Sequence, residues 1–335
     1  MQEPEGKKLT MDDVAKALGV SKTTVSRAVS GKGRIGEETR QRVKDYIAQH
    51  NYHLNAPEKA AESSHTCNIG VVLPPDLLSF DLLFFPKTLK GISEVAAKEE
   101  FDVLLTLADT NDLSNLARVV ECRKVDGVLL LRTLRDDAVA DLLKKSGLPF
   151  VAVGMSKDPQ VCQVDHDHIE ACRELTSILL MKGLKKIAVV AADMNDMRNQ
   201  NRMEGFYKAH TELGLEPDRS LLFTQIDSQM LADRVTDTIL MRGADCIIGA
   251  DDRIAGQVLK KLEEEKVCIP QEIRLAAFSD SQLLKAAKPG VTAVRFHMEE
   301  LGRTACRVLF QKIRGKEAAP VTKLSYEVSI RESTK

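Results

Sequence analysis

The sequence predicts a protein of two parts: an N-terminal all-α helix-turn-helix headpiece and a larger α/β part that folds as two lobes. Its 335 residues are too many for one ordinary hydrophobic core. The first sixty residues carry helical patterns only, whereas short apolar runs alternate with amphipathic helical stretches from Cys67 onward. Such alternation builds parallel sheets, and about 270 residues of it suit two lobes better than one.

Charge is unevenly distributed along a chain whose formal net charge is −1. Between Lys7 and His50 there are ten Lys and Arg residues against five Asp and Glu, an excess of five positive charges. A basic segment on a mildly acidic body is typical of a module that binds the phosphate backbone of DNA.

Cysteine usage and hydropathy limit the class of protein. Seven cysteines are scattered between Cys67 and Cys306 without a CxxC pair, which predicts reduced thiols rather than disulfides or zinc ligands. The N-terminus lacks the apolar segment of a signal peptide, and no apolar run approaches ~18 residues. We therefore expect a cytoplasmic protein that does not contact a membrane and needs no cofactor.

Three helices are predicted in the N-terminal part. Thr10 and Asp13 form a capping-box-like start for the first helix, which ends at Gly19. Ser21 can cap the second helix, and the third is expected to begin near Gly36. The inner faces are predicted to carry Val14, Ala17, Leu18, Val25, Ala28, Val29, Val43 and Ile47, with Tyr52 closing the core. Two short helices around a glycine-bearing turn indicate helix-turn-helix, although periodicity alone also fits any small helical bundle.

The order of residues is more specific than their periodicity. The segment TMDDVAKALGVSKTTVSRAVSGKGRIGEETRQRVKDYIAQHNY strongly resembles the DNA-binding headpiece of the LacI/GalR repressor family, with DVA, GVS, TVSR, TR and NY at the family's spacing. The resemblance implies that Lys22 and Thr23 read bases, with Arg27 one turn later on the same face. The DNA-binding residues it implies are Thr10, Ser21, Lys22, Thr23, Arg27, Ser30, Tyr52, Asn55 and Ala61. The alternative for Lys22 and Arg27 is an ordinary solvated helix face.

The hinge after the headpiece departs from the family pattern. Relatives continue Y-x-P-N-x-x-A-x-x-L, where a short helix forms on the operator and its leucine enters the minor groove. In this chain Leu54 replaces the proline, Glu58 replaces the alanine, and Ala61 stands where the leucine wedge would be. A helix is still compatible with Asn55 as its cap. We expect DNA binding to persist with less kinking of the DNA.

The resemblance extends to the α/β part through NIGVVLP, KVDGVLLL, RMEGF and CIIGADDRIA. It implies a sensor like a periplasmic binding protein: two Rossmann-like lobes, three crossovers and an effector beyond the carboxyl ends of the strands. The predicted strands are 68–74, 102–107, 127–131, 150–153, 186–191, 246–249 and 274–278, with helices at 89–99, 169–182 and 203–213 among those between them. The expected domains are a headpiece at 8–53, a hinge at 54–66 and an effector-binding and dimerisation domain at 67–335. Within the last, we expect lobe 1 at about 67–164 and 294–322 and lobe 2 at about 165–293 and 323–335.

The effector pocket is predicted by carrying family positions over one at a time. Arg202, two residues before Glu204, matches the arginine that clamps the effector, and its guanidinium suits hydroxyls, carboxylate or phosphate. The family's ligand-binding aspartate falls on Ser279, with Asp280 beside it. The effector-binding residues implied are Asp76, Asp81, Phe84, Phe85, Arg198, Arg202, Asp251, Ser279 and Asp280. The alternatives are an interlobe salt bridge for Arg202 and core packing for the two phenylalanines.

Other chemistry is weakly supported. The run Asp165-His-Asp-His168 could bind a metal, but alternation in an extended segment points neighbouring ligands apart, so we expect no metal site. The sequence contains neither a nucleophile elbow nor a phosphate loop, which argues against an enzyme. A solute-binding protein for transport and an α/β enzyme fused to a DNA-binding module are the alternatives. We expect a homodimeric repressor of near-palindromic operator DNA that responds to a sugar or sugar phosphate.

Overall fold

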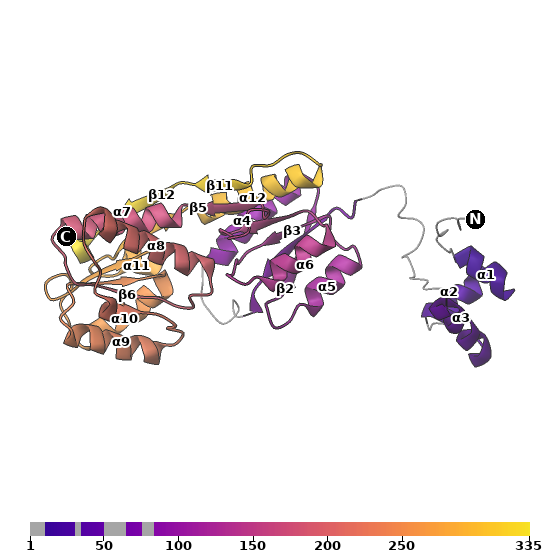
Figure 1. Cartoon of the computed structure of the whole chain (residues 1–335), viewed down its shortest axis with the longest axis horizontal. Helices are drawn as coiled ribbons and strands as arrows, with labels where there is room; N and C mark the ends of the chain where they lie inside the picture. The colour runs from indigo at the N-terminus through magenta and orange to yellow at the C-terminus, as the bar shows by residue number, and fades with distance from the viewer. Residues whose placement is uncertain (1–10, 31–34, 50–64, 76–83) are drawn as a thin grey trace. The chain divides into compact units, whose positions relative to one another are not determined.

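The computed structural model describes residues 11–30, 35–49, 65–75 and 84–335, in two compact units, 1–64 and 65–335 (Figure 1). The described helices of the smaller unit are α1 (Met11–Leu18), α2 (Lys22–Ser30) and α3 (Glu37–Gln49). Their core contains Val14, Val25 and Val43, all fully buried. The inner face of α1 also carries Ala15, whereas Ala17 is exposed, which corrects the prediction for that helix.

The first lobe of the larger unit contains a parallel sheet of six strands in the order β11-β5-β4-β3-β1-β2. The strands are β1 (Asn68–Leu73), β2 (Asp102–Leu107), β3 (Gly127–Leu130), β4 (Phe150–Val153), β5 (Gln163–His166) and β11 (Val321–Leu324). One apolar layer packs the sheet against α4 (Phe84–Lys98) and α12 (Met298–Ile313). The other packs it against α5 (Ser114–Glu121) and α6 (Ala138–Ser146). The lobe is therefore a three-layer α/β sandwich.

The second lobe repeats this plan with the order β12-β10-β9-β8-β6-β7, in which only β12 is antiparallel to its neighbour. The strands are β6 (Ile187–Val190), β7 (Leu222–Phe223), β8 (Cys246–Gly249), β9 (Arg274–Ala277), β10 (Thr292–Phe296) and β12 (Tyr326–Ser329). One apolar layer involves α7 (His168–Met181) and α8 (Met197–Glu212). The other involves α9 (Gln229–Met241), α10 (Asp252–Glu264) and α11 (Gln282–Ala286).

All seven predicted strands are present, which confirms the α/β fold class of the larger part. The prediction missed β5, β7, β10, β11 and β12, and it began α4 and α8 several residues too late. The chain passes between the lobes after β5, after β10 and between β11 and β12. Because β5 and β11 belong wholly to the first sheet, that lobe extends to His166 and Leu324, each two residues beyond the expected boundary. Because β10 belongs to the second sheet, the second lobe extends to Phe296, past the boundary expected at 293.

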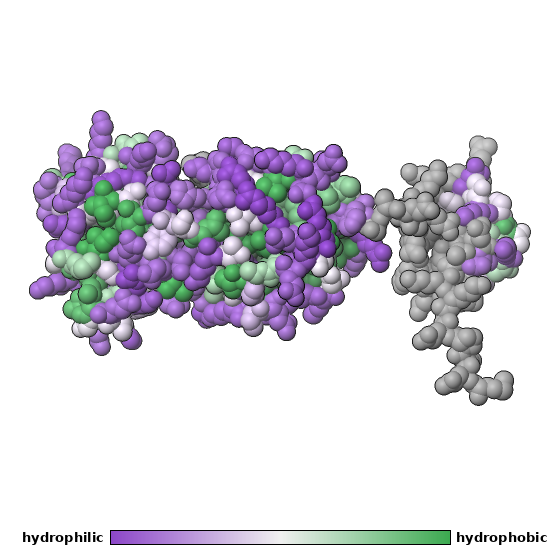
Figure 2. All heavy atoms as spheres, turned by 90° about the horizontal axis from the view of Figure 1, so that it is seen from above, coloured by the Kyte–Doolittle hydropathy of each residue, from purple (hydrophilic) through white to green (hydrophobic). Residues whose placement is uncertain are grey.

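The described surface is mostly hydrophilic on the face shown in Figure 2, with smaller hydrophobic areas between the hydrophilic residues. Among the described residues, no helix combines the length and the apolar character needed to cross a bilayer.

Two glycines allow α4 and α12 to pack with their backbones in close contact. A Cβ atom at Gly302 would lie 2.1 Å from the carbonyl oxygen of Thr88, and one at Gly91 would lie 2.0 Å from that of Glu299. Neither clash can be relieved by rotating a side chain, because both obstacles are backbone atoms. The packing of α12 across the first sheet therefore depends on these two positions.

We expect Gly302→Ala to destabilise the protein by about 1–3 kcal/mol, because overpacking forces the two helices apart. Gly256→Ala is the matched control: it lies inside α10, where the nearest neighbour of an added Cβ is Leu283 Cδ2 at 3.4 Å. The control gains helix propensity and is expected to be neutral or stabilising by up to ~1 kcal/mol. Urea unfolding measures both variants, and equal stabilities would contradict the close-packing argument.

Candidate functional site

The exposed face of α2 carries the predicted base-reading residues. Lys22, Thr23 and Arg27 are all exposed, while Val25 and Ala28 on the opposite face are buried in the three-helix core. Ser21 precedes the helix, and its Oγ accepts a hydrogen bond of 3.1 Å from the backbone N–H of Thr24. This cap fixes the start of α2, so that its first residues project from a defined helix end.

The other predicted DNA-binding and effector residues lie at the edges of the described segments or beyond them. Ser30 is the last residue of α2. Thr10, Tyr52, Asn55, Ala61, Asp76 and Asp81 lie outside the described residues.

A cavity of about 360 Å³ lies between the two lobes of the larger unit. Its walls come from loops that follow the carboxyl ends of strands in both sheets, as expected for open α/β sheets. The first lobe contributes Pro74, Phe84, Phe85, Arg132, Leu134, His166 and Met298. The second contributes His168, Ala192, Asp193, Asp196, Arg198, Asn199, Arg202, Gln225, Ile226, Asp227, Asp251, Asp252, Arg253 and Ser279.

Six of the predicted effector residues lie together in this cavity: Phe84, Phe85, Arg198, Arg202, Asp251 and Ser279. Phe85 is almost fully buried in the apolar layer between the first sheet and α4, and Phe84 is partly buried beside it. Both phenylalanines therefore pack in the core of the first lobe and also line the cavity. Asp251 also caps α10, since its Oδ1 accepts from the backbone N–H of Ile254 at 2.7 Å.

Asp280 differs in its position from the other described residues predicted to bind effector. Its two carboxylate oxygens accept hydrogen bonds of 2.8 and 2.5 Å from the guanidinium of Arg331, and it is absent from the cavity wall. Arg331 follows β12 near the end of the chain, so this ion pair joins the C-terminal segment to the loop after β9. In this arrangement Asp280 holds the C-terminal segment rather than lining the cavity.

The two predicted arginines differ in their surroundings. Arg202 is only 6% exposed, makes no ion pair among the described residues, and has a buried Nε without a hydrogen-bond partner. The interlobe salt bridge considered as its alternative is thus not formed within the described part of the chain. Arg198 instead makes a two-pronged ion pair with Asp196, at 3.2 and 2.8 Å, and its Cζ lies 4.9 Å from the centre of the Phe84 ring.

Two histidines of the run considered for metal binding, His166 and His168, also line the cavity. The chain turns from β5 into α7 between them, so the strict alternation expected from an extended segment does not apply. His166 Nε2 accepts from the backbone N–H of His297 at 3.2 Å, and His168 Nε2 lies 3.3 Å from Asp165 Oδ1. Burial lowers the pKa of His166 to about 3, so its ring stays neutral at physiological pH. The described residues hold no group of three or more potential metal ligands.

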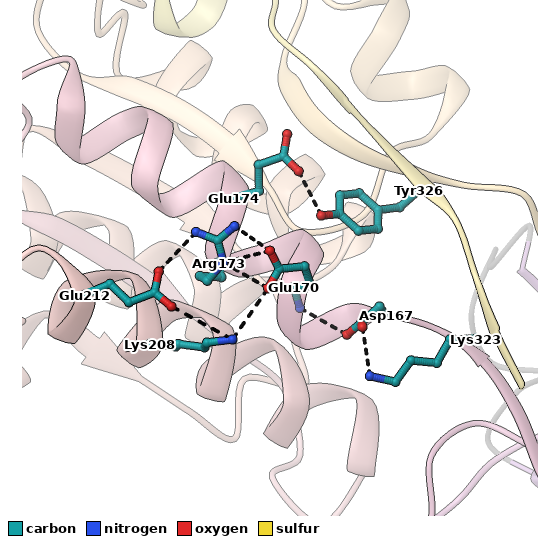
Figure 3. A network of polar contacts seen from close by, with 8 residues as sticks. All are labelled: Asp167, Glu170, Arg173, Glu174, Lys208, Glu212, Lys323 and Tyr326. Carbon is teal, nitrogen blue, oxygen red and sulfur yellow. Dashed lines mark hydrogen bonds and ion pairs between the residues drawn. The ribbon is translucent and has the colours of Figure 1, made fainter. Parts of the chain in front are cut away.

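A polar network on α7 fixes the third crossing of the chain (Figure 3). Lys323 of β11 bonds to Asp167 at 2.8 Å, and Tyr326 of β12 donates to Glu174 at 2.8 Å. The network continues through Arg173, which bonds to Glu170 and to Glu212 of α8. The two strands that flank the crossing are therefore attached to the same helix of the second lobe.

Comparison with known proteins identifies both parts of the chain. Residues 10–55 match the model for bacterial regulatory proteins of the lacI family, and residues 176–334 match a periplasmic binding protein-like domain. The chain is 25% identical over 332 residues to catabolite control protein A of Staphylococcus xylosus, covering 98% of this chain and 99% of that protein. It is 32% identical over 218 residues to the transcriptional regulator MalR of Streptococcus pneumoniae, covering 64% and 66% of the two chains.

Several solved structures are similar to this chain in fold. A transcriptional regulator CelR–cellobiose complex matches with a TM-score of 0.75 and 26% identity, covering 97% of this chain and 99% of that one. A LacI family transcriptional regulator from Enterococcus faecium with bound ribose matches with a TM-score of 0.68 and 25% identity, covering 80% and 98%. The lac repressor dimer bound to operator, at 21% identity and a TM-score of 0.70, matches in fold over 98% of this chain and 99% of that one.

The carboxyl group of Asp252 offers a test of the cavity's electrostatics. Burial, together with the neighbouring Asp251 carboxylate, raises its pKa to about 6, so the folded state binds this proton more tightly than the unfolded chain. Its contribution to stability is fully present below the unfolded pKa of about 3.8 and is lost as the pH rises through 6.

We expect Asp252→Asn, which removes the buried charge, to raise the stability of the ligand-free protein at pH 8 by about 1–3 kcal/mol. The gain is expected to shrink steadily as the pH falls from 8 to 5. Asp193→Asn is the control, since Asp193 lines the same cavity but is exposed. Thermal unfolding at each pH measures both variants, and a gain independent of pH would refute the assignment.

Proposed function

Because the chain belongs to the LacI family of bacterial regulatory proteins, we propose that it represses transcription under the control of an unphosphorylated sugar bound between its lobes. It is a DNA-binding transcription regulator, and the relatives it matches are regulators rather than enzymes. The observation that carries the proposal is the cavity, which gathers polar side chains from both lobes at the carboxyl ends of two parallel sheets. We place this DNA-binding function in the cytoplasm.

The charges around the cavity favour a neutral ligand. Its wall contains five aspartates, Asp193, Asp196, Asp227, Asp251 and Asp252, against four arginines, Arg132, Arg198, Arg202 and Arg253. Arg198 is neutralised by Asp196, and Arg253 donates to the backbone carbonyls of Asp227 and Ile226. A phosphate group would meet more negative than positive charge, whereas sugar hydroxyls can donate to carboxylates and accept from guanidinium groups. Cellobiose and ribose in the two related structures are ligands of this kind.

A homodimer is the assembly that we propose for DNA binding. Strand β2 is an edge of the first sheet and exposes Leu105 and Leu107 on one face, which suits burial against a second copy. Two headpieces related by a twofold axis would place two recognition helices in adjacent half-sites of a near-palindrome. Effector binding that changes the angle between the lobes would alter the affinity for operator, and operator would alter the affinity for effector by the same factor.

Base reading is tested with Arg27→Ala on operator fragments selected from genomic DNA. We expect the variant to lose about 1–3 kcal/mol of specific binding and to relax preference at one base pair, because a base-edge contact is removed. Arg42→Ala, an exposed arginine of α3, is the matched control and is expected to change specific binding far less. If Arg27→Ala weakens binding to random DNA equally, Arg27 contacts only phosphate.

Effector binding is tested by thermal shift with a panel of mono- and disaccharides and their phosphates. We expect an unphosphorylated sugar to raise the melting temperature of the parent and to have no effect on Arg202→Ala, because Arg202 supplies a buried donor to the cavity. Arg303→Ala, in a partly exposed ion-pair network on α12 outside the cavity wall, is the control that keeps the shift. A sugar phosphate that stabilises the parent more strongly than every neutral sugar contradicts the proposed ligand class.

A further inference from the structure

We propose that a clasp at the rim of the cavity holds the two lobes together before any effector binds. The clasp consists of the backbone pairing of residues 133–135 with residues 195–197 and of the Arg198 side chain over Phe84. The first segment follows β3 in the first lobe, and the second leads into α8 in the second lobe. This inference rests on the proposed function, because it concerns the regulation of the effector cavity.

The backbone part of the clasp is a short antiparallel pairing between lobes. The N–H of Arg135 donates to the carbonyl of Asn195 at 3.0 Å, and the N–H of Met197 donates to the carbonyl of Thr133 at 3.1 Å. Leu134 and Asp196 form the bridge between these two bonds. About sixty residues of chain separate the two segments, and they belong to different lobes. They meet only when the lobes are close together at the rim of the cavity, which we call the closed arrangement.

The side-chain part of the clasp starts from Asp196, which occupies the bridge itself. Its Oδ1 accepts from the backbone N–H of Arg198 at 2.9 Å, and the same carboxylate holds the Arg198 guanidinium. The guanidinium is thereby oriented over the ring of Phe84, which belongs to the first lobe. A cation held over an aromatic face is attracted to it, so this contact adds a second attachment between the lobes.

The clasp also forms part of the cavity wall. Phe84, Leu134, Asp196 and Arg198 all line the cavity, so an effector that enters or leaves must disturb the attachment or pass beside it. The three crossings of the chain remain as connections between the lobes when the clasp is open. The clasp thus biases an equilibrium between closed and open lobes that the effector and the DNA both influence.

Disulfide trapping tests the backbone pairing directly. Because hydrogen bonds flank the bridge, Leu134 and Asp196 are a non-hydrogen-bonded antiparallel pair, whose Cα atoms lie roughly 4.5 Å apart and whose side chains share one face. That separation suits a disulfide, for which Cα atoms lie about 4.4–6.8 Å apart. The full chain carries Leu134→Cys/Asp196→Cys, with the exposed Cys67, Cys122 and Cys268 changed to Ser.

We expect the ligand-free double variant to form the disulfide under mild oxidation at least tenfold faster than Leu134→Cys/Asn195→Cys. In this control the second cysteine is equally near in sequence, but its side chain points to the opposite face of the pairing. Mass spectrometry of tryptic peptides gives both rates. Equal rates, or no disulfide in either variant, would overturn the backbone pairing, which is the part of the clasp that remains once Asp196→Cys has removed the carboxylate that orients Arg198.

Hydrogen exchange provides a measurement that needs no cysteine. In the ligand-free parent we expect the amides of Arg135 and Met197 to be protected, and Arg198→Ala to speed their exchange at least tenfold. Arg253→Ala, another arginine of the cavity wall, is expected to leave both amides unchanged, as is Val128 N–H inside the first lobe in either variant. Exchange of both amides at unprotected rates in the parent refutes the clasp. Neither experiment involves DNA or sugar, so the outcome is independent of the proposed repressor function.

Discussion

Three crossings of the chain between its two sheets govern the chemistry of residues 65–335. In a parallel sheet, polar loops collect at the carboxyl ends of the strands, so one lobe alone supplies only one wall of a site. The crossings after β5, after β10 and between β11 and β12 hold the two sheets with their carboxyl ends toward a common cavity. Arg132 and Arg202, which belong to different lobes, line the same space for this reason.

Buried polar atoms at the junction between the lobes lack hydrogen-bond partners more often than those inside the lobes. Four buried polar atoms there have no hydrogen-bond partner in the described structure: Thr133 Oγ1, His166 Nδ1, His168 Nδ1 and Arg202 Nε. Each buried polar group without a partner costs on the order of 1–3 kcal/mol. Within the described layers of the two lobes such atoms are fewer, Gln257 Oε1 of α10 being one, so a change in lobe angle that pairs the four atoms at the junction is easier than a change within a lobe. Strain of this kind suits a sensor whose two arrangements differ by a few kcal/mol.

Local sequence pattern was sufficient to predict which face of α2 is exposed and to predict seven of the strands. Val25 and Ala28 had to face the small core, which left Lys22, Thr23 and Arg27 exposed on the opposite face, as the structure shows. The same reasoning failed for Ala17, because an eight-residue helix has few apolar positions and Ala15 fits the core equally well by spacing. The short strands β7, β11 and β12 escaped prediction because they are partly exposed and carry no buried run.

The sequence by itself determined the helix-turn-helix, the alternation of strands and helices, and which polar residues follow which strands. Those properties depend on residues within a few positions of one another in the sequence, because hydrophobic periodicity and helix capping are local patterns. Only the tertiary structure decided the partners of these polar residues. Asp280 pairs with Arg331 and does not line the cavity, and Arg198 lies over the Phe84 ring. His166, at the end of β5, lines the cavity. Each of these pairings joins segments far apart in the chain, and the crossings that bring them together leave no local pattern in the sequence.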